Sequence, residues 1–461
     1  MLAQPLEDVV GDSEWHDDAP GHARRTADRS ETGRRGSSGR WDAYPARDRA
    51  NARNQRLDRL FSQVGGVWSA ARVGVPVAMR LNHRRPEMLL DERGVSALPD
   101  LPTADFTFDP HQPGACVAGL RPYRVNSYRL EGETLGDKFV LHNYGHGGGG
   151  ITLSWGCAAR VRDLVLTHQR RSEVVERDIA VIGAGVMGLT AATLLLDLGL
   201  NVTIYSDREP VETTSYKAGG QWAVSLLEFS KDFDKVRELQ YILRTAYTMF
   251  KAAIGKGFGV SEVDNYSVNS TSGIDVVHDL VPGLLPQREY LRRLPFEGHN
   301  VSGYRYRTLL VEPPIFIPRL ERDLKARGVR FVNRRFINSA DVLTSLTQKI
   351  IINCTGLGAK NLWNDSDMMP LRGQLAMLRP QPNLEYLYGQ NGYLFPRNDH
   401  VVIGGTVEET CDEAFDPVKC QELVGYMAGV FGQLPPEPMP EFFIHHPRNE
   451  VLVDPRLSIS P

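Results

Sequence analysis

The chain has 461 residues, a net charge of −3 and 41% hydrophobic residues, which favours two or three globular domains. Acids and bases nearly balance, so nothing favours a nucleic-acid partner. The five scattered cysteines form no C-x-x-C pair, which argues against a disulfide framework or a metal site and is typical of a reducing compartment. We find no apolar stretch of about 18 residues, no secretory signal and no peroxisomal tripeptide, so we expect a cytoplasmic protein without a membrane partner.

The first 58 residues are rich in Arg, Asp, Gly and Ser and poor in apolar side chains. They predict a disordered tail, because so little apolar surface cannot offset the entropy lost on ordering. A nucleic-acid-binding arm is the weaker alternative, since acids interleave with the arginines. Residues 59–113 have weak periodicity and many prolines, and we predict a partly ordered linker there.

Order begins at residue 114, where 117–124 and 138–143 read as strands and 152–169 as an amphipathic helix. Four consecutive glycines, 147–150, come just before that helix. Because glycine runs cost backbone entropy, we expect them to serve backbone contact with a flat ligand rather than packing. A flexible linker is the alternative, but a strand and a helix flank the run without a gap.

A strand, a glycine-rich turn and a helix follow at 178–197. The turn carries the G-x-G-x-x-G spacing in Gly183, Gly185 and Gly188. The first glycine permits a tight turn, the second lets the backbone approach a pyrophosphate, and the third lets the helix pack closely on the strand. The pyrophosphate would lie at the helix N-terminus near Val186, where free N–H groups and the helix dipole favour anions.

A second strand, 201–205, leads to Asp207, which lies 19 residues after Gly188 and suits a ribose hydroxyl. The whole unit predicts a dinucleotide site. The alternative is a glycine-rich turn that binds nothing. Further along we predict helices at 233–253, 314–327 and 416–431, and strands at 275–279, 329–333, 349–356, 371–378 and 401–405.

Several blocks together resemble the D-amino-acid oxidase family, over roughly 114–435. The blocks are GLRPYR (119–124), HNYGHGGGGITLSWGCA (142–158), GAGVMGL (183–189), YSDR (205–208), TTSYKAGGQW (213–222), TLLVEPPIFIPRL (308–320), NCTGLGA (353–359), RGQL (372–375) and YLFP (393–396). In the family the first two blocks close the chain, whereas here they precede the nucleotide strand. The order therefore indicates a circular permutation, which nearby chain ends permit.

The resemblance implies an α/β fold with a glutathione-reductase-like (Rossmann) FAD-binding domain and a mixed-sheet α+β substrate domain. The predicted division is a disordered tail at 1–58, a linker at 59–113, the FAD domain at 114–230 (114–166 plus 178–230) and 346–370, the substrate domain at 231–345 and 371–435, and a loose tail at 436–461. It also implies FAD as cofactor, with a D-amino acid and oxygen as partners, and it leaves a homodimer open.

The family reaction removes hydride from the α-carbon of a D-amino acid and gives a 2-oxo acid, ammonia and hydrogen peroxide. The cofactor supplies the redox chemistry, and the protein positions the substrate. By the resemblance, Arg121 binds the substrate carboxylate, which suits the planar fork of a guanidinium. Tyr393 shares that carboxylate, Tyr388 is the nearest match for a mobile lid tyrosine, and the carbonyl of Gly148 takes the amine.

The remaining site residues are those that the resemblance places on FAD. They are Gly183, Gly185, Val186, Met187, Gly188, Asp207, Arg208, Thr213, Thr214, Gly220, Gln221, Trp222, Thr355, Gly356, Gly147, Gly149, Gly150, Ile151 and Thr152. No residue is assigned to a metal. His142 and His146 are interpreted as structural.

Other functions stay open at this point. Within the class, a D-aspartate oxidase or an imino-acid or sarcosine-type oxidase is compatible with the same blocks, and the placement of Arg305 and Arg307 is unknown. From another class, the chain could be a non-catalytic FAD-binding relic of a rearranged gene. An NAD-linked dehydrogenase would explain the glycine fingerprint but not HNYGHGGGG.

Overall fold

The computed structural model describes residues 100–268 and 273–434. All the described residues belong to one compact unit. The tails predicted at 1–58 and 436–461, and residues 59–99 of the predicted linker, lie outside the described residues. Nowhere in the described part is a helix both long and apolar enough to cross a membrane.

One sheet has six strands in the order β2-β3-β10-β4-β5-β9. Its strands, in that order, span Arg129–Leu135, Lys138–Tyr144, Ile350–Asn353, Asp178–Ile182, Asn201–Ser206 and Arg330–Asn333. Only the β2–β3 pair is antiparallel. In β10, Ile350 and Ile352 pack into one buried cluster and Ile351 into another on the opposite face. This explains the unbroken apolar run, because a parallel sheet is covered on both faces.

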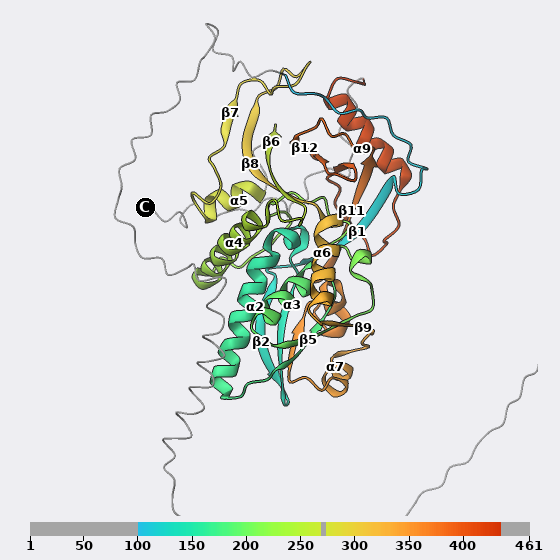
Figure 1. Ribbon diagram of the computed structural model, residues 1–461. Coiled ribbons are helices and arrows are strands. Elements are labelled where there is room, and N and C mark those ends of the chain that lie inside the picture. Colours follow the sequence, from blue (N-terminus) through green and yellow to red (C-terminus); the bar gives the residue numbers. More distant parts are fainter. Residues whose placement is uncertain (1–99, 269–272, 435–461) are drawn as a thin grey trace, which may run out of the picture. The chain divides into compact units, whose positions relative to one another are not determined.

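Helices cover both faces of this sheet. On one face lie α2 (Gly150–Ser172), α3 (Val186–Asp197) and α6 (Pro313–Ala326), side by side in Figure 1. The short helices α7 (Ser339–Ser345) and α8 (Ala359–Leu362) contribute apolar side chains to the cluster on the other face. This doubly covered parallel sheet is the nucleotide-binding architecture that the sequence predicts.

The second sheet has nine strands, in the order β1-β11-β14-β13-β12-β6-β8-β7, with β15 paired to β11. Its strands, in that order and with β15 last, span Cys116–Arg124, Met368–Leu378, Val401–Gly404, Gly392–Pro396, Tyr386–Gln390, Val260–Ser267, Gly303–Val311, Glu289–Leu291 and Glu408–Glu409. The β12–β6 pair is parallel and the other pairs are antiparallel. The sheet is mixed, as predicted for the substrate domain.

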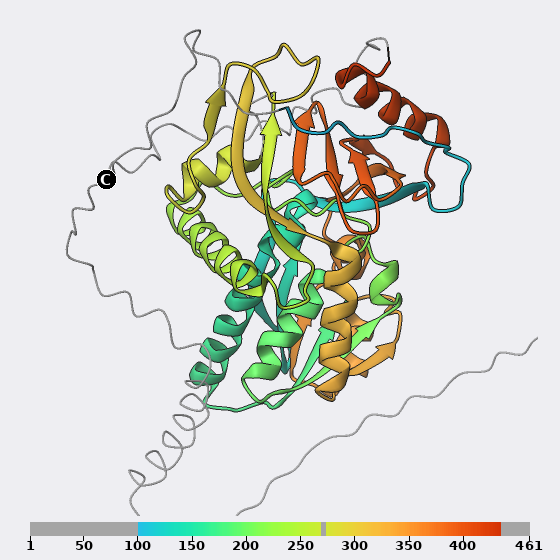
Figure 2. The same cartoon turned by 45° about the horizontal axis from the view of Figure 1, so that its top comes forward.

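Three further helices surround this sheet. Helix α9 (Pro417–Val430) packs on β11 and β14, as Figure 2 shows, and α4 (Phe233–Ala253) packs on α2. Helix α5 (Gly273–Leu280) stands where the sequence predicted a strand at 275–279. That prediction is wrong: Ile274, Val277 and Val281 recur at helical spacing and are buried, whereas a strand would have buried alternate residues.

The two sheets divide the chain differently from the predicted domains at two places. Strand β1 lies within 114–230, yet it pairs with β11 of the mixed sheet. Strand β9 lies within 231–345, yet it pairs with β5 of the parallel sheet. Because the partners of both strands come from distant segments, local periodicity does not indicate to which sheet each strand belongs.

Candidate FAD and substrate site

A cavity of about 1290 Å³ lies between the carboxyl ends of the parallel strands and the face of the mixed sheet. The parallel sheet contributes the residues that end β3, β10, β4 and β5, and the mixed sheet contributes side chains of β1, β6, β8, β11 and β13. Carboxyl ends of parallel strands are where nucleotides bind in open α/β folds. The volume exceeds the range of about 300–1,000 Å³ that is usual for a drug-sized ligand, so a dinucleotide with a substrate has room.

The three fingerprint glycines occupy the positions that their predicted roles require. Gly183 has φ +107°, and a Cβ there would lie 2.4 Å from the carbonyl oxygen of Cys354 on the neighbouring strand. A Cβ at Gly188 would lie 2.0 Å from the carbonyl oxygen of Gly183, so this glycine lets α3 pack against the strand and does not line the cavity. Gly185 faces the cavity, and its Cβ would meet only the Ser215 hydroxyl, at 3.3 Å.

Helix α3 begins at the cavity wall. Val186 and Met187 line it, and the Val186 amide donates to the Ser215 hydroxyl over 3.0 Å. Asp207 and Arg208, after β5, also line the cavity. The Arg208 guanidinium is held in two bonds to the Glu413 carboxylate, at 3.0 and 3.2 Å, so it already has a counter-ion.

The segment 213–222 runs along the cavity beside β1. Thr213, Thr214, Gly220 and Gln221 line it, and the Gln221 amide donates to Asn265 and Tyr306 over 3.2 and 3.4 Å. Gly220 has φ +111°. Trp222 differs from its predicted place on the flavin: it is fully buried, does not line the cavity, and packs with Tyr247 at a ring distance of 5.0 Å. Trp222 thus belongs to the buried core, whereas its neighbour Gln221 lines the cavity.

The glycine run does serve packing, contrary to the expectation from entropy alone. Gly147 has φ +53°, and its Cβ would lie 1.8 Å from the Leu226 carbonyl oxygen. A Cβ at Gly148 would lie 2.5 Å from the Ser225 hydroxyl. The run therefore lets the turn before α2 approach another backbone, and Gly147 and Gly148 also line the cavity.

The other residues around this turn divide between the cavity and the interior. Gly150 and Ile151 line the cavity, whereas Gly149 and Thr152 are buried behind it. The Thr152 hydroxyl donates to the Ala223 carbonyl over 2.8 Å and accepts from the Ala223 amide over 3.2 Å. Thr152 thus ties the start of α2 to the segment that follows Trp222.

After β10, Thr355 and Gly356 line the cavity, and the Thr355 hydroxyl donates to Asn353 over 2.8 Å. His142 is buried between Glu133 and Asn353, at 2.7 and 2.9 Å. His146 contributes to the cavity wall, and burial lowers the pKa of His146 to about 3. A ring with that pKa stays neutral near pH 7, which agrees with a structural interpretation of His146.

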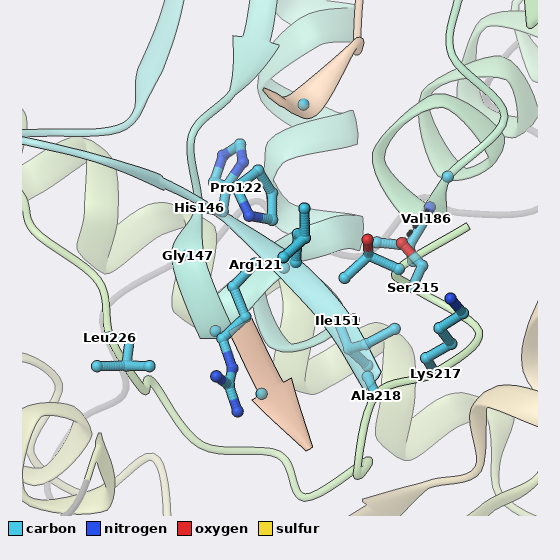
Figure 3. Close-up of a pocket in the computed structure, with 18 of the residues that line it drawn as sticks. Arg121, Pro122, His146, Gly147, Ile151, Val186, Ser215, Lys217, Ala218 and Leu226 are labelled. Atoms are coloured by element: carbon cyan, nitrogen blue, oxygen red, sulfur yellow. Dashed lines mark hydrogen bonds between the residues drawn. The ribbon is translucent and has the colours of Figure 1, made fainter. Parts of the chain in front are cut away.

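Arg121 and Tyr393 meet at the other end of the cavity (Figure 3 shows Arg121). They come from β1 and β13, and glycines on the neighbouring strands make room for them. A Cβ at Gly373 would lie 2.2 Å from the Arg121 guanidinium, and a Cβ at Gly404 would lie 2.4 Å from the Tyr393 ring. The Arg121 guanidinium donates to the Thr406 carbonyl over 2.9 Å.

Arg121 and Tyr393 are both partly buried in the cavity wall. Burial lowers the pKa of Arg121, and interaction with the Tyr393 hydroxyl partly opposes that shift. Burial likewise raises the pKa of Tyr393, against the effects of Arg121 and Arg397. A guanidinium uses five N–H donors in a fixed fork, so one bond to a carbonyl leaves donors for a planar anion.

Tyr388 does not lie like a mobile lid residue. Although it contributes to the cavity wall, its ring is fully buried with Phe296 and Phe431, at centroid distances of 5.4 and 4.8 Å. Its hydroxyl donates to Gln390 over 2.7 Å and lies 3.2 Å from a ring nitrogen of His299. Tyr388 and Tyr386 on β12 both belong to the buried cluster of Phe296 and Phe431, whereas Tyr393 packs against a different cluster.

Sequence reasoning missed several residues of the site. Ser215, Lys217, Asn265, Tyr306, Gly373 and Glu413 line the cavity without having been proposed. Ser215 and Lys217 lie inside the block TTSYKAGGQW and Gly373 inside RGQL, so their segments carried a signal. Asn265, Tyr306 and Glu413 belong to strands and loops without a distinctive pattern, and only the tertiary fold brings them to the cavity.

Comparison with known proteins agrees with this geometry. A family model described as FAD dependent oxidoreductase matches residues 178–445, more than half of the chain, and the chain belongs to this family. Human D-aspartate oxidase is 28% identical over 236 residues, which cover 50% of this chain and 68% of that protein. The D-amino-acid oxidase of Streptomyces coelicolor is 29% identical over 252 residues, covering 51% and 72%. Among solved structures, the glycine oxidase of Bacillus cereus is similar at a TM-score of 0.42 and 17% identity, over 55% of this chain and 78% of that one.

The protein is therefore an FAD-dependent oxidoreductase, and its cavity suits that cofactor. The turn at Gly183 and the open side of Gly185 leave space where a pyrophosphate would meet the N-terminus of α3. Glycine backbone and the start of α2, at Gly147–Ile151, form a further part of the wall. The cavity then continues to Arg121 and Tyr393, where a second, smaller ligand can lie.

Proposed function

We propose that the protein oxidises neutral D-amino acids with FAD and passes the electrons to oxygen, releasing a 2-oxo acid, ammonia and hydrogen peroxide. The observation that carries this proposal is the partly buried Arg121–Tyr393 pair, which lines the same cavity as the glycine turns that suit FAD. FAD, when bound, accepts the hydride of the substrate Cα–H bond.

Arg121 holds the substrate α-carboxylate in this proposal. Its guanidinium is charged, is partly buried in the cavity wall, and keeps its place through the Thr406 carbonyl. Charge-assisted bidentate bonds to a carboxylate are strong and directional there. The Tyr393 hydroxyl, next to the guanidinium, donates to the same carboxylate.

The carboxylate anchor also selects the enantiomer. With the carboxylate at Arg121 and the amine at the Gly148 carbonyl, the D-enantiomer directs its Cα–H at the cofactor and the L-enantiomer directs its side chain there. The amine loses its proton before the reaction, so no side chain of the cavity need act as a general base. Positioning of this kind supplies much of the rate gain in reactions where the cofactor does the chemistry.

Neutral side chains are favoured because the nearby arginines face elsewhere. Arg305 and Arg307 both pair with Asp264, at 3.1 and 2.7 Å, and neither lines the cavity. Gln221, Asn265 and Tyr306 line this part of the wall with amide and hydroxyl groups. Among residues 100–268 and 273–434, Arg121 is the cation that lines this part of the wall beside Gln221, Asn265 and Tyr306, so a second carboxylate, as in D-aspartate, is disfavoured there.

We also propose that the chain is a circular permutation of the family order. The family match begins at residue 178, while the block that supplies Arg121 and the glycine run precedes it. Strand β3 pairs with β10, which itself pairs with β4, and only residues 173–177 separate α2 from β4. The early block thus contributes strands to both sheets, and a short connection leads from it to β4. Glu173, in a left-handed conformation, ends α2.

The test is the absorption spectrum of the purified protein before and after anaerobic addition of an amino acid. We expect bound oxidised FAD that D-alanine bleaches, that D-aspartate bleaches far more slowly, and that L-alanine leaves unchanged. Readmitted oxygen should restore the spectrum and produce hydrogen peroxide. FAD that no D-amino acid reduces would overturn the proposal in favour of a non-catalytic flavoprotein, and faster bleaching by D-aspartate than by D-alanine would overturn the preference for neutral side chains.

A further inference from the structure

We propose that Lys217 is a cofactor-binding residue, whose ammonium group pairs with the pyrophosphate of FAD beside the N-terminus of α3. The proposal deepens the function above, since it rests on FAD in this cavity, but it does not depend on which amino acid is oxidised. Lysine is a point charge well suited to a phosphate oxygen.

Lys217 is held where it can reach that position. Its amide donates to the Thr214 carbonyl over 3.2 Å, which forms a turn along the cavity wall. Its side-chain stem lies across β1, because a Cβ built on Gly119 would meet the Lys217 Cβ and Cδ atoms at 3.6 Å each. In Figure 3 the ammonium end points toward the part of the cavity where Ser215 and Val186 lie, while Arg121 points away from it.

The ammonium group has no hydrogen-bonding partner of its own among residues 100–268 and 273–434. The carboxylate near it is Glu413, whose pKa is lowered by Arg208 first and by Lys217 to a smaller extent. Glu413 is engaged in both bonds from Arg208. Lys217 is thus a half-buried cation in the cavity wall that is left without a paired anion, and such a group is stabilised by a bound anion.

The other cations of the cavity are placed for different tasks. Arg121 lies at the substrate end and Arg208 is paired with Glu413. Arg334 and Arg335 follow β9, which lies beyond β5 at the edge of the sheet, on the side where Asp207 would meet the adenosine ribose. Lys217 is the cation that shares the middle of the cavity with the α3 N-terminus, where the two phosphates carry their charge.

The test measures FAD affinity of the full chain by quenching of flavin fluorescence, with Lys217→Met, Lys217→Arg and Lys256→Met. Lys256 is exposed and does not line the cavity, so Lys256→Met removes the same charge elsewhere. For a charge-assisted bond we expect Lys217→Met to raise the Kd of FAD about 10- to 100-fold, and Lys217→Arg to recover most of that loss. Lys256→Met should stay within about twofold of the parent, because an exposed charge outside the site contributes little.

Two further measurements distinguish a phosphate contact from a structural effect. ADP carries the two phosphates without the flavin ring, so its Kd should rise by a similar factor in Lys217→Met. Added salt should shrink the difference between parent and variant, because ions screen a charge pair. The thermal transition of the cofactor-free variant should match that of the parent.

Three results would overturn the proposal, and each has a separate meaning. Parent-like FAD affinity in Lys217→Met shows that the ammonium does not contact the cofactor. Weaker FAD with unchanged ADP places Lys217 at the flavin ring instead of the phosphates. A parent that takes up no FAD removes both this proposal and the cavity assignment, whereas FAD uptake without oxidation of D-amino acids defeats the proposed function and leaves Lys217 standing.

Discussion

The two walls of the cavity are built in different ways. On the side of the parallel sheet the wall presents backbone at two glycine turns, with Gly183 and Gly185 before α3 and Gly147 and Gly148 before α2, and we call it the backbone wall. On the side of the mixed sheet the wall is side chains, and its glycines, such as Gly373, serve by leaving room for a neighbour. On the first wall an added methyl group enters the cavity at Gly185 but strains the fold at Gly183, and on the second it displaces a neighbouring side chain, as at Gly373.

The largest effect is expected at Gly185, on the backbone wall. Gly185 has φ −75° and ψ 179°, which any residue adopts, and its Cβ would meet only the Ser215 hydroxyl. Gly185→Val should therefore fold, with a thermal transition close to that of the parent. Its side chain would occupy the space of the pyrophosphate, so the Kd of FAD should rise by about 100-fold or more, which is roughly 2.7 kcal/mol.

Gly183 provides the contrast on the same turn. Its φ of +107° and the 2.4 Å approach of Cys354 mean that Gly183→Ala strains the fold itself. We expect a clearly lowered thermal transition in addition to lost FAD. Equal destabilisation by the two changes, measured on cofactor-free protein, would show that Gly185 has a packing role and not a cofactor role.

On the side-chain wall, the largest effect is expected at Arg121. Arg121→Leu should keep FAD bound but lower kcat/KM for D-alanine, because a desolvated carboxylate loses its partner. A loss of about 2–5 kcal/mol of transition-state stabilisation corresponds to roughly a 30- to several-thousand-fold decrease in kcat/KM. Arg305→Leu is the matched control, since Arg305 pairs with Asp264 outside the cavity, and it should stay within about threefold. If Arg121→Leu also stays within about threefold, the carboxylate binds elsewhere.

A smaller effect is expected from Gly373→Ala, which leaves the arginine in place but crowds it. The new Cβ would lie 2.2 Å from the guanidinium, which can swing aside because it ends a flexible side chain. Stability should change little, while misplacement of about 1 Å should lower kcat/KM by roughly 10- to 100-fold. Gly389→Ala is the control, because Gly389 also lines the cavity but its new Cβ would have only ordinary contacts, the nearest with the Ser267 hydroxyl at 3.7 Å. Equal kcat/KM values in the two variants would contradict the role of Gly373.

The same difference between the walls decides how much the sequence predicted. The backbone wall depends on glycine spacing within one segment, so the turn at Gly183–Gly188 and the strand ending near Asp207 were predicted closely. The side-chain wall depends on which strands pair, and the sequence of a single segment does not determine that pairing. Arg121 and Tyr393 were proposed through family resemblance, whereas Asn265 and Tyr306 were missed because their strands, β6 and β8, have no recognisable motif.

Errors in the prediction have physical reasons of the same kind. The glycine run was expected to face only a ligand, but Gly147 also packs against Leu226, a contact between segments that are far apart in sequence. Trp222 was placed on the cofactor by its position in a block, although it points to the opposite side of the chain from Gln221. In both cases the residue lies in the predicted segment, and the tertiary contact decides its role.

The smallest effect is expected at Tyr388, which distinguishes a core tyrosine from a mobile lid. Tyr388→Phe removes a buried hydroxyl that donates to Gln390 over 2.7 Å, and this should lower stability by about 1 kcal/mol. Because the ring stays packed among Phe296, His299 and Phe431, kcat/KM for D-alanine should remain within about twofold.

Tyr393→Phe is the paired variant on the cavity side, and loss of its bond to the carboxylate should cost about 1 kcal/mol, or roughly fivefold in kcat/KM. Steady-state kinetics with both variants, together with their thermal transitions, measures the two effects separately. A kcat loss of tenfold or more in Tyr388→Phe, with unchanged stability, would mean that this tyrosine leaves the core during turnover and acts on the substrate after all.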